Sequence, residues 1–170
     1  MRNLILLFLA SFLCFVAVES SVAQSKNKTI VLVRHAEKDT SVANNPDPEL
    51  SAEGRERAIK LMNFVKRYKP HEIFSTNYKR TRQTAEPIAA KRKKEIQTYD
   101  PAKQADLVAK IMASTTDHNL IVGHSNTIPV LANLIAKKEV FRNLLETEYG
   151  VVWVIRLKKG VLTKVEVFPF

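Results

Sequence analysis

The chain has 170 residues, the size of one domain, and its 27 lysine and arginine residues against 17 acidic ones give a net charge of +10. The one cysteine, Cys14, leaves no partner for a disulfide and no set of thiolates for a metal site. The basic residues form scattered groups without interleaved aromatic side chains, so the composition argues against a nucleic-acid-binding surface.

The first residues have the pattern of a secretory signal peptide. A basic start at Arg2 is followed by an apolar run over residues 4–18 and by the small residues Ser21 and Ala23. The run is shorter than the roughly 20 residues that span a bilayer, which disfavours a membrane anchor. We therefore expect a signal peptide at residues 1–23, cleaved after Ala23, and export to the periplasm or the extracellular space. The mature protein, a single domain over residues 24–170, is then expected to make no stable insertion in a membrane.

The mature chain alternates predicted strands with predicted helices. Four consecutive aliphatic residues, 30–33, predict a buried strand, and Ser51 suits the N-cap of the helix after the following polar loop. Pro87 is expected to kink or shorten the second helix. The expected strands are 29–33, 72–76, 95–99, 119–123, 151–157 and 161–167, and the expected helices begin near 51, 79, 102 and 127. This order predicts an α/β fold, a three-layer α/β/α sandwich whose mostly parallel sheet ends in an antiparallel C-terminal edge hairpin.

Chemically useful side chains follow three of the predicted strands. Arg34 and His35 end the first strand, Arg80 follows the second, and His124 follows the fourth. Because carboxyl ends of parallel strands lie on one rim of a sheet, these groups are candidates for a common site. Two histidines with arginines and few carboxylates make a poor metal site, so no metal or other cofactor is expected. The same set suits a phosphoryl group, because guanidinium groups bind its oxygens and a neutral imidazole can attack phosphorus.

Four segments of the chain together resemble the histidine phosphatase superfamily, which is phosphoglycerate-mutase-like in fold. They occur in the family's order and at its spacing, over residues 29 to about 136. A lone Arg-His pair would be weak evidence, but four ordered motifs are specific. The segments are Val33-Arg34-His35-Ala36-Glu37, the helix start Leu50-Ser51-x-Glu53-Gly54, the stretch from Ser75 to Ala85, and Val122-Gly123-His124-Ser125-Asn126-Thr127.

The resemblance implies a role for each matched residue. His35 would be the nucleophile that becomes phosphohistidine, and Arg34, Arg80 and His124 would form the phosphate pocket around it. Neighbouring guanidinium charges would disfavour protonation of His35 and keep its attacking nitrogen free near neutral pH. Arg82 aligns with a variable position, and we expect it at the surface.

The chain departs from the family pattern between Thr98 and Asn119. This stretch has no room for the lid insertion of the mutases, so hydrolysis is favoured over phosphoryl transfer to a second substrate. Many members carry a Glu or Asp here as the acid for the leaving group, and Asp100 is the nearest candidate for that role.

Three functions remain open from the sequence. The leading one is an exported phosphatase that hydrolyses a small anionic phosphomonoester without a metal, through a phosphohistidine at His35. A second is a catalytically weak phosphate- or polyanion-binding module on the same fold, and a third is a phosphohistidine protein phosphatase. The residues name neither the natural substrate nor the oligomeric state.

Overall fold

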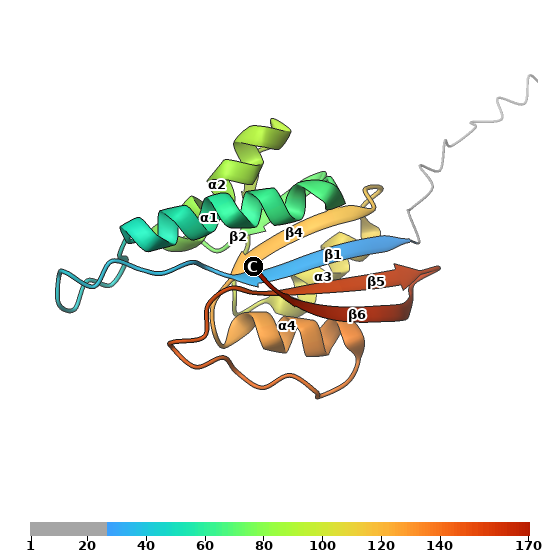
Figure 1. Cartoon of the computed structure of the whole chain (residues 1–170). Coiled ribbons are helices and arrows are strands. Elements are labelled where there is room, and N and C mark those ends of the chain that lie inside the picture. The colour runs from blue at the N-terminus through green and yellow to red at the C-terminus, as the bar shows by residue number, and fades with distance from the viewer. Residues whose placement is uncertain (1–26) are drawn as a thin grey trace, which may run out of the picture.

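The structure is a computed structural model that describes residues 27–170 (Figure 1). The signal peptide predicted at residues 1–23 lies outside the described residues, so that assignment, and with it export, stays a prediction. Within the described range, no helix is both long enough and apolar enough to cross a membrane.

A six-stranded sheet in the order β3-β2-β4-β1-β5-β6 forms the centre of the molecule. The first four of these strands run parallel to their neighbours, and β5 and β6 continue the sheet as an antiparallel hairpin. The three-layer sandwich and its antiparallel edge, predicted from the sequence, are confirmed. The strands are β1 (Lys28–Arg34), β2 (Glu72–Ser75), β3 (Ile96–Thr98), β4 (His118–Gly123), β5 (Val151–Lys158) and β6 (Val161–Pro169).

Alternate residues of the central strand face opposite layers of helices. Ile30 and Leu32 of β1 pack in one core cluster with residues of α3 and α4, whereas Val31 and Val33 pack in another with residues of α1 and α2. Both faces of β1 are therefore buried, which explains the unbroken aliphatic run in the sequence. The helices are α1 (Ala52–Val65), a short 3-10 turn η1 (Lys66–Tyr68), α2 (Lys79–Arg92), α3 (Gln104–Ala113) and α4 (Thr127–Ala136).

The two local signals predicted for helices, a cap at Ser51 and a break at Pro87, have different outcomes. Ser51 caps α1 as expected, since its hydroxyl oxygen accepts a hydrogen bond from the backbone nitrogen of Gly54 at 3.0 Å. Pro87, expected to kink or shorten α2, lies inside the helix, which continues to Arg92. Its flanking residues Ala85 and Ile88 are fully buried against the sheet, and this packing offsets the backbone hydrogen bond that proline removes.

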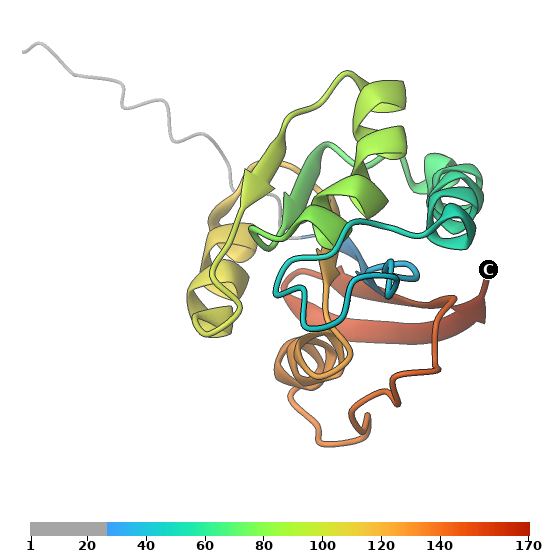
Figure 2. The same cartoon turned by 90° about the vertical axis from the view of Figure 1, so that its left-hand side faces the viewer.

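The carboxyl ends of β1, β2 and β4 form one rim of the sheet. Figure 2 looks onto this rim, where the loop over residues 39–49 and the irregular segment 137–150 surround the strand ends. In open α/β sheets, ligands bind in the crevice outside the carboxyl ends of the strands. The fold therefore delivers the residues after β1 and β4 to the expected place for a site.

Candidate active site

Strand pairing brings His35 and His124 together. β1 and β4 are parallel neighbours with Arg34 opposite Gly123, so the residues that follow them emerge side by side. The backbone nitrogen of His35 donates a hydrogen bond to the carbonyl oxygen of Gly123 at 2.9 Å. The two imidazole rings lie edge to face with centroids 5.5 Å apart. Both histidines therefore serve one site.

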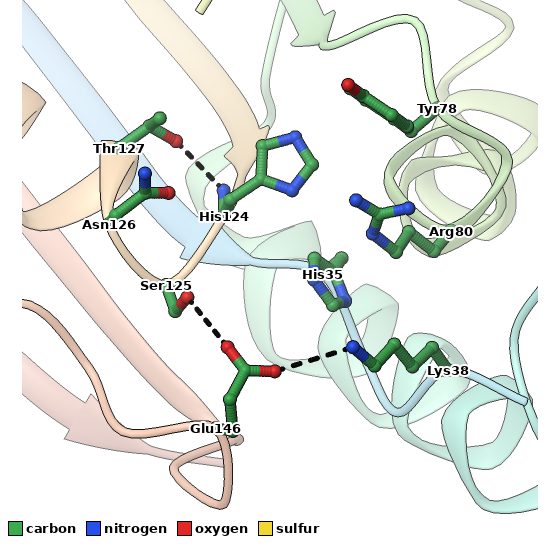
Figure 3. A pocket seen from close by; sticks show the side chains of 9 residues that line it. All are labelled: His35, Lys38, Tyr78, Arg80, His124, Ser125, Asn126, Thr127 and Glu146. Carbon is green, nitrogen blue, oxygen red and sulfur yellow. Dashed lines mark hydrogen bonds and ion pairs between the residues drawn. The ribbon is translucent and has the colours of Figure 1, made fainter. Parts of the chain in front are cut away.

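A cavity of about 300 Å³ opens over these two rings (Figure 3). Its polar lining comes from several strand ends and loops that are far apart in the sequence. Besides His35 and His124, the lining includes Lys38, Tyr78, Arg80, Ser125 and Glu146.

The hydrogen bonds of His35 define its reactive nitrogen. Nδ1 lies 2.7 Å from the carbonyl oxygen of Ala36, which can only accept, so Nδ1 carries the proton. In a neutral ring, Nε2 then holds the free lone pair. The ring of His35 is thus oriented and set in one tautomer before any substrate binds.

A chain of hydroxyl groups fixes His124 in a similar way. The Thr81 hydroxyl donates its proton to a backbone carbonyl, so it accepts from Thr76 at 2.9 Å. The Thr76 oxygen is then left to accept from Nε2 of His124, also at 2.9 Å. Thr81 and Thr76 are both fully buried, which makes this arrangement rigid.

Both histidines are held neutral at physiological pH. Burial is the largest cause that lowers the pKa of His35 to about 3, and the charges of Arg34 and Arg80, with that of His124 once it is protonated, lower it further against the opposing bond to Ala36. Burial followed by the charges of Arg80 and Arg34 lowers the pKa of His124 to about 4. The sequence argument named only the guanidinium charges, whereas burial contributes more.

These shifts predict a loss of stability in mild acid. The unfolded chain binds protons at histidine below its ordinary pKa of 6.5, whereas folded His35 stays neutral until about pH 3. Stability is therefore complete above pH 6.5 and falls as the pH drops toward the folded value, by about 2 kcal/mol for His35 at pH 5. Urea unfolding at pH 7.5 and pH 5 measures this loss. A smaller loss is expected for His35→Gln, and an equal loss in that variant would contradict the assignment.

Arg80 lines the cavity with a guanidinium group that is not fully hydrogen-bonded. It sits in the first turn of α2, its Nε is buried without a hydrogen-bond partner, and its Nη1 lies 3.8 Å from the Asp47 carboxylate. Its guanidinium carbon also stacks 4.4 Å from the ring centroid of Tyr78. A fixed cation with an unsatisfied Nε donor beside two neutral imidazoles suits the binding of an anion.

Arg34 lies beside the site but does not line the cavity. Its buried side chain reaches under segment 137–150, where Nη1 donates to the carbonyl oxygens of Leu145, Glu146 and Glu148. Nη2 contacts the Glu146 carboxylate at 3.2 Å. These acceptors occupy both terminal nitrogens, whereas Nε of Arg34 is buried without a hydrogen-bond partner, so the phosphate contact expected for Arg34 stays a prediction. Its charge still lowers the pKa of both histidines.

The remaining motif residues hold the loop that follows β1. The Glu37 carboxylate accepts two hydrogen bonds from Nε of Arg57 in α1, at 2.6 and 2.8 Å. The Thr84 hydroxyl of α2 accepts from the backbone nitrogen of Ala36 at 3.0 Å. Both motif helices thus fix the residues next to His35.

Comparison with known proteins agrees with this geometry. The sequence model of the histidine phosphatase superfamily, branch 1, matches residues 30–102, which include Arg34, His35 and Arg80. This match supports the assignment to the histidine phosphatase superfamily that the four motifs indicate. No curated protein matches it in sequence.

Solved structures of the superfamily share its fold. The putative phosphohistidine phosphatase SixA from Agrobacterium tumefaciens is 19% identical, with a TM-score of 0.66 over 84% of this chain and 98% of that one. A putative alpha-ribazole-5'-P phosphatase from Escherichia coli is 12% identical, with a TM-score of 0.69 over 84% and 97%. A mycobacterial glucosyl-3-phosphoglycerate phosphatase is 14% identical, with a TM-score of 0.62 over 85% and 98%. At these identities the likeness establishes the fold alone.

Asp100, the residue expected to act as the acid, does not line the cavity over His35 and His124. Asp100 lines a different hollow with Phe74, Tyr99 and residues of α3, and its carboxylate accepts a hydrogen bond from the backbone nitrogen of Ala102 at 2.9 Å. The turn after β3 directs this side chain toward α3, so Asp100 is not placed to protonate a leaving group over His35. Arg82, which was not expected at the site, does not line the cavity and is partly exposed.

Glu146 is the site residue that the sequence did not reveal. It lies in the irregular segment between α4 and β5, and its carboxylate reaches Ser125 Oγ at 3.2 Å and Lys38 Nζ at 3.5 Å (Figure 3). Burial acts to raise the pKa of Glu146, but Arg34, Ser125 and Lys38 together hold it below its ordinary value. The cavity thus contains an ionised carboxylate as well as its cations.

Proposed function

We propose that the protein is an exported phosphatase that hydrolyses a phosphomonoester through a phosphohistidine at His35, without a metal. The observation that carries this proposal is the neutral, oriented imidazole of His35, which shares the cavity with Arg80 and its unsatisfied Nε donor. Export rests on the leader sequence. The fold of known phosphatases supports the reaction class, and the substrate is open.

The residues suit a two-step displacement. Nε2 of His35 attacks phosphorus, the bond from phosphorus to the ester oxygen breaks, and the leaving group takes that electron pair. Water then attacks the phosphohistidine, the phosphorus–nitrogen bond breaks, and inorganic phosphate and neutral His35 are released. Arg80 stabilises the charge on the phosphoryl oxygens in both steps. A dianion beside His124 raises the pKa of that imidazole, which then becomes a second cation against the oxygens.

The supply of a proton to the leaving group determines which substrates we expect the protein to hydrolyse. Among the described residues that line the cavity, Glu146 is the one carboxylic acid, and it is ionised at neutral pH. Good leaving groups need no donor, so aryl phosphates and phosphohistidine should react faster than alkyl phosphates. This preference favours, as a second candidate, a phosphohistidine protein phosphatase.

Trapping the intermediate tests the reaction class. The purified chain is incubated in EDTA with a labelled aryl phosphate and quenched in alkali, which preserves phosphohistidine. Label on His35, identified by mass spectrometry and lost on a chase with unlabelled substrate, is the expected result. Binding of phosphate without label or turnover would instead support the polyanion-binding module. Rates with a phosphohistidine peptide, an aryl phosphate and an alkyl phosphate then separate the two phosphatase candidates.

Replacing Glu146 with glutamine is expected to lower the KM for a dianionic aryl phosphate by about two- to tenfold, because it removes a negative charge from the cavity. The amide still offers an oxygen to Ser125 and Lys38. Steady-state kinetics and inhibition by inorganic phosphate measure the effect. Glu86→Gln, an equal charge change on the exposed face of α2, is the control. A fall in kcat with unchanged KM would show that Glu146 takes part in proton transfer instead.

A further inference from the structure

Two histidines and an aspartate meet at the opposite rim of the sheet from the cavity. His71 directly precedes β2, Asp117 precedes β4, and His118 is the first residue of β4. β2 and β4 are parallel neighbours, and the backbone nitrogen of His71 donates to the carbonyl oxygen of His118 at 2.9 Å. The amino ends of β1 and β4, where this cluster lies, are on the right in Figure 1. The backbone therefore sets the three side chains close together.

The donor atoms of this cluster converge. Nδ1 of His71 lies 3.4 Å from one Asp117 oxygen, and Nε2 of His118 lies 4.0 Å from the other. One ligand atom from each residue falls within 4.8 Å of the others. Bonds of roughly 2.0–2.2 Å in a tetrahedral zinc site put ligand atoms about 3.3 Å apart, so a small rotation of these partly exposed side chains closes the set.

The orientation of His118 leaves Nε2 as its metal-binding atom. Its Nδ1 is buried without a hydrogen-bond partner, while Nε2 faces Asp117. The rings of His71 and His118 are nearly parallel, with planes 15° apart and centroids separated by 5.7 Å. Both rings thus present an edge nitrogen toward the same carboxylate.

The surrounding charges permit a cation. Glu72 and Asp117 carry two negative charges against one positive charge on Lys28, the ammonium of which is bound by the carbonyl oxygens of Ser114 and Thr116. In a hollow that His118 also lines, Arg67 stacks on Phe64, and Arg156 pairs with the Glu166 carboxylate at 3.4 Å. Both arginines can keep these partners when a cation binds between the two histidines.

We propose that His71, Asp117 and His118 bind a divalent transition-metal ion, with zinc the best match. Two imidazole nitrogens and one carboxylate oxygen form a common ligand set for Zn²⁺, whereas Ca²⁺ and Mg²⁺ prefer oxygen ligands. A fourth position faces solvent and takes water. Because the site joins the turn before β2 to the start of β4, the ion stabilises the fold and takes no part in chemistry at His35.

Zinc titration of the chain, stripped with EDTA and then dialysed, tests the proposal in a phosphate-free buffer. Calorimetry should show one Zn²⁺ bound per chain, and the melting temperature should rise by about 5 °C at 100-fold excess over Kd. The variants His71→Ala and Asp117→Asn should each lose binding and the thermal shift, while aryl phosphatase activity in EDTA stays at the wild-type level.

His35→Ala is the matched control, because the active-site histidines could also bind zinc. It should keep the full zinc stoichiometry and thermal shift. Zinc binding that survives in His71→Ala with Asp117→Asn, or that disappears in His35→Ala, would overturn the proposal. A failure to detect zinc binding at Zn²⁺ concentrations up to roughly 100 μM would overturn it as well, because the binding free energy would then be smaller than about 5.5 kcal/mol. Zinc binding and the thermal shift are measured without turnover. A negative result would therefore contradict the zinc site and leave the proposed phosphatase activity untouched, and a failure of the phosphatase proposal would not affect the zinc site.

Discussion

Replacing His35 with alanine is expected to reduce hydrolysis of an aryl phosphate at least about 1,000-fold, because His35 supplies the proposed nucleophile. Nε2 of His124 donates to Thr76, and the Lys38 ammonium is paired with the Glu146 carboxylate. Arg80 and His124 would still bind phosphate in the variant. The loss should therefore appear in kcat, with inorganic phosphate still binding.

Steady-state rates in EDTA, with the melting temperature measured alongside, test this expectation. His71→Ala is a suitable control, since it removes a histidine from the opposite rim of the sheet. His124→Asn should give an intermediate loss, because it removes a phosphate ligand and leaves the nucleophile in place. Activity above one tenth of wild type in folded His35→Ala would end the phosphohistidine mechanism.

The parts of the site that the sequence predicted are those set by the sheet. The aliphatic run 30–33 and the strand before His124 could be recognised from composition alone, and parallel pairing then requires that the residues after them meet. Arg80 follows from the motif at the start of α2. Each of these placements depends on regular structure, in which the position of one residue determines that of its neighbours.

The placement of Arg34 follows from strand alternation, which the motif did not take into account. Successive side chains of a strand point to opposite faces. Ile30 and Leu32 face the layer of α3 and α4, so Arg34 shares that face, while His35 turns toward the cavity. Arg34 therefore reaches the segment that leads into β5, where it contacts the Glu146 carboxylate.

Glu146 and Asp100 show where sequence patterns carry little information. Glu146 belongs to segment 137–150, which has no periodic apolar pattern, and its place at the cavity depends on three carbonyl groups that bind Arg34. Asp100 follows β3 at the expected point in the chain, but a single turn decides which way its side chain faces. Backbone carbonyl contacts and turn geometry of this kind leave no signature in residue type.

Gly54→Ala is expected to lower the free energy of unfolding by about 3 kcal/mol or more, although alanine is the better helix former by about 1 kcal/mol. A Cβ atom at Gly54 would lie 2.1 Å from the backbone oxygen of Glu37. That oxygen already accepts a hydrogen bond from the backbone nitrogen of Ser51 at 2.9 Å, so it cannot move away without breaking the start of α1. The clash therefore outweighs the gain in helix propensity.

Urea unfolding of Gly54→Ala beside Ser51→Ala separates this clash from the loss of a helix cap. Ser51→Ala removes the hydroxyl that caps the same turn and should cost about 1 kcal/mol without pushing the Glu37 backbone. Because Glu37 is two residues from His35, Gly54→Ala should also reduce kcat in the fraction that stays folded, whereas Ser51→Ala should leave kcat nearly unchanged. A stability equal to wild type in Gly54→Ala would mean that the loop after β1 yields easily, and with it the orientation of the His35 ring.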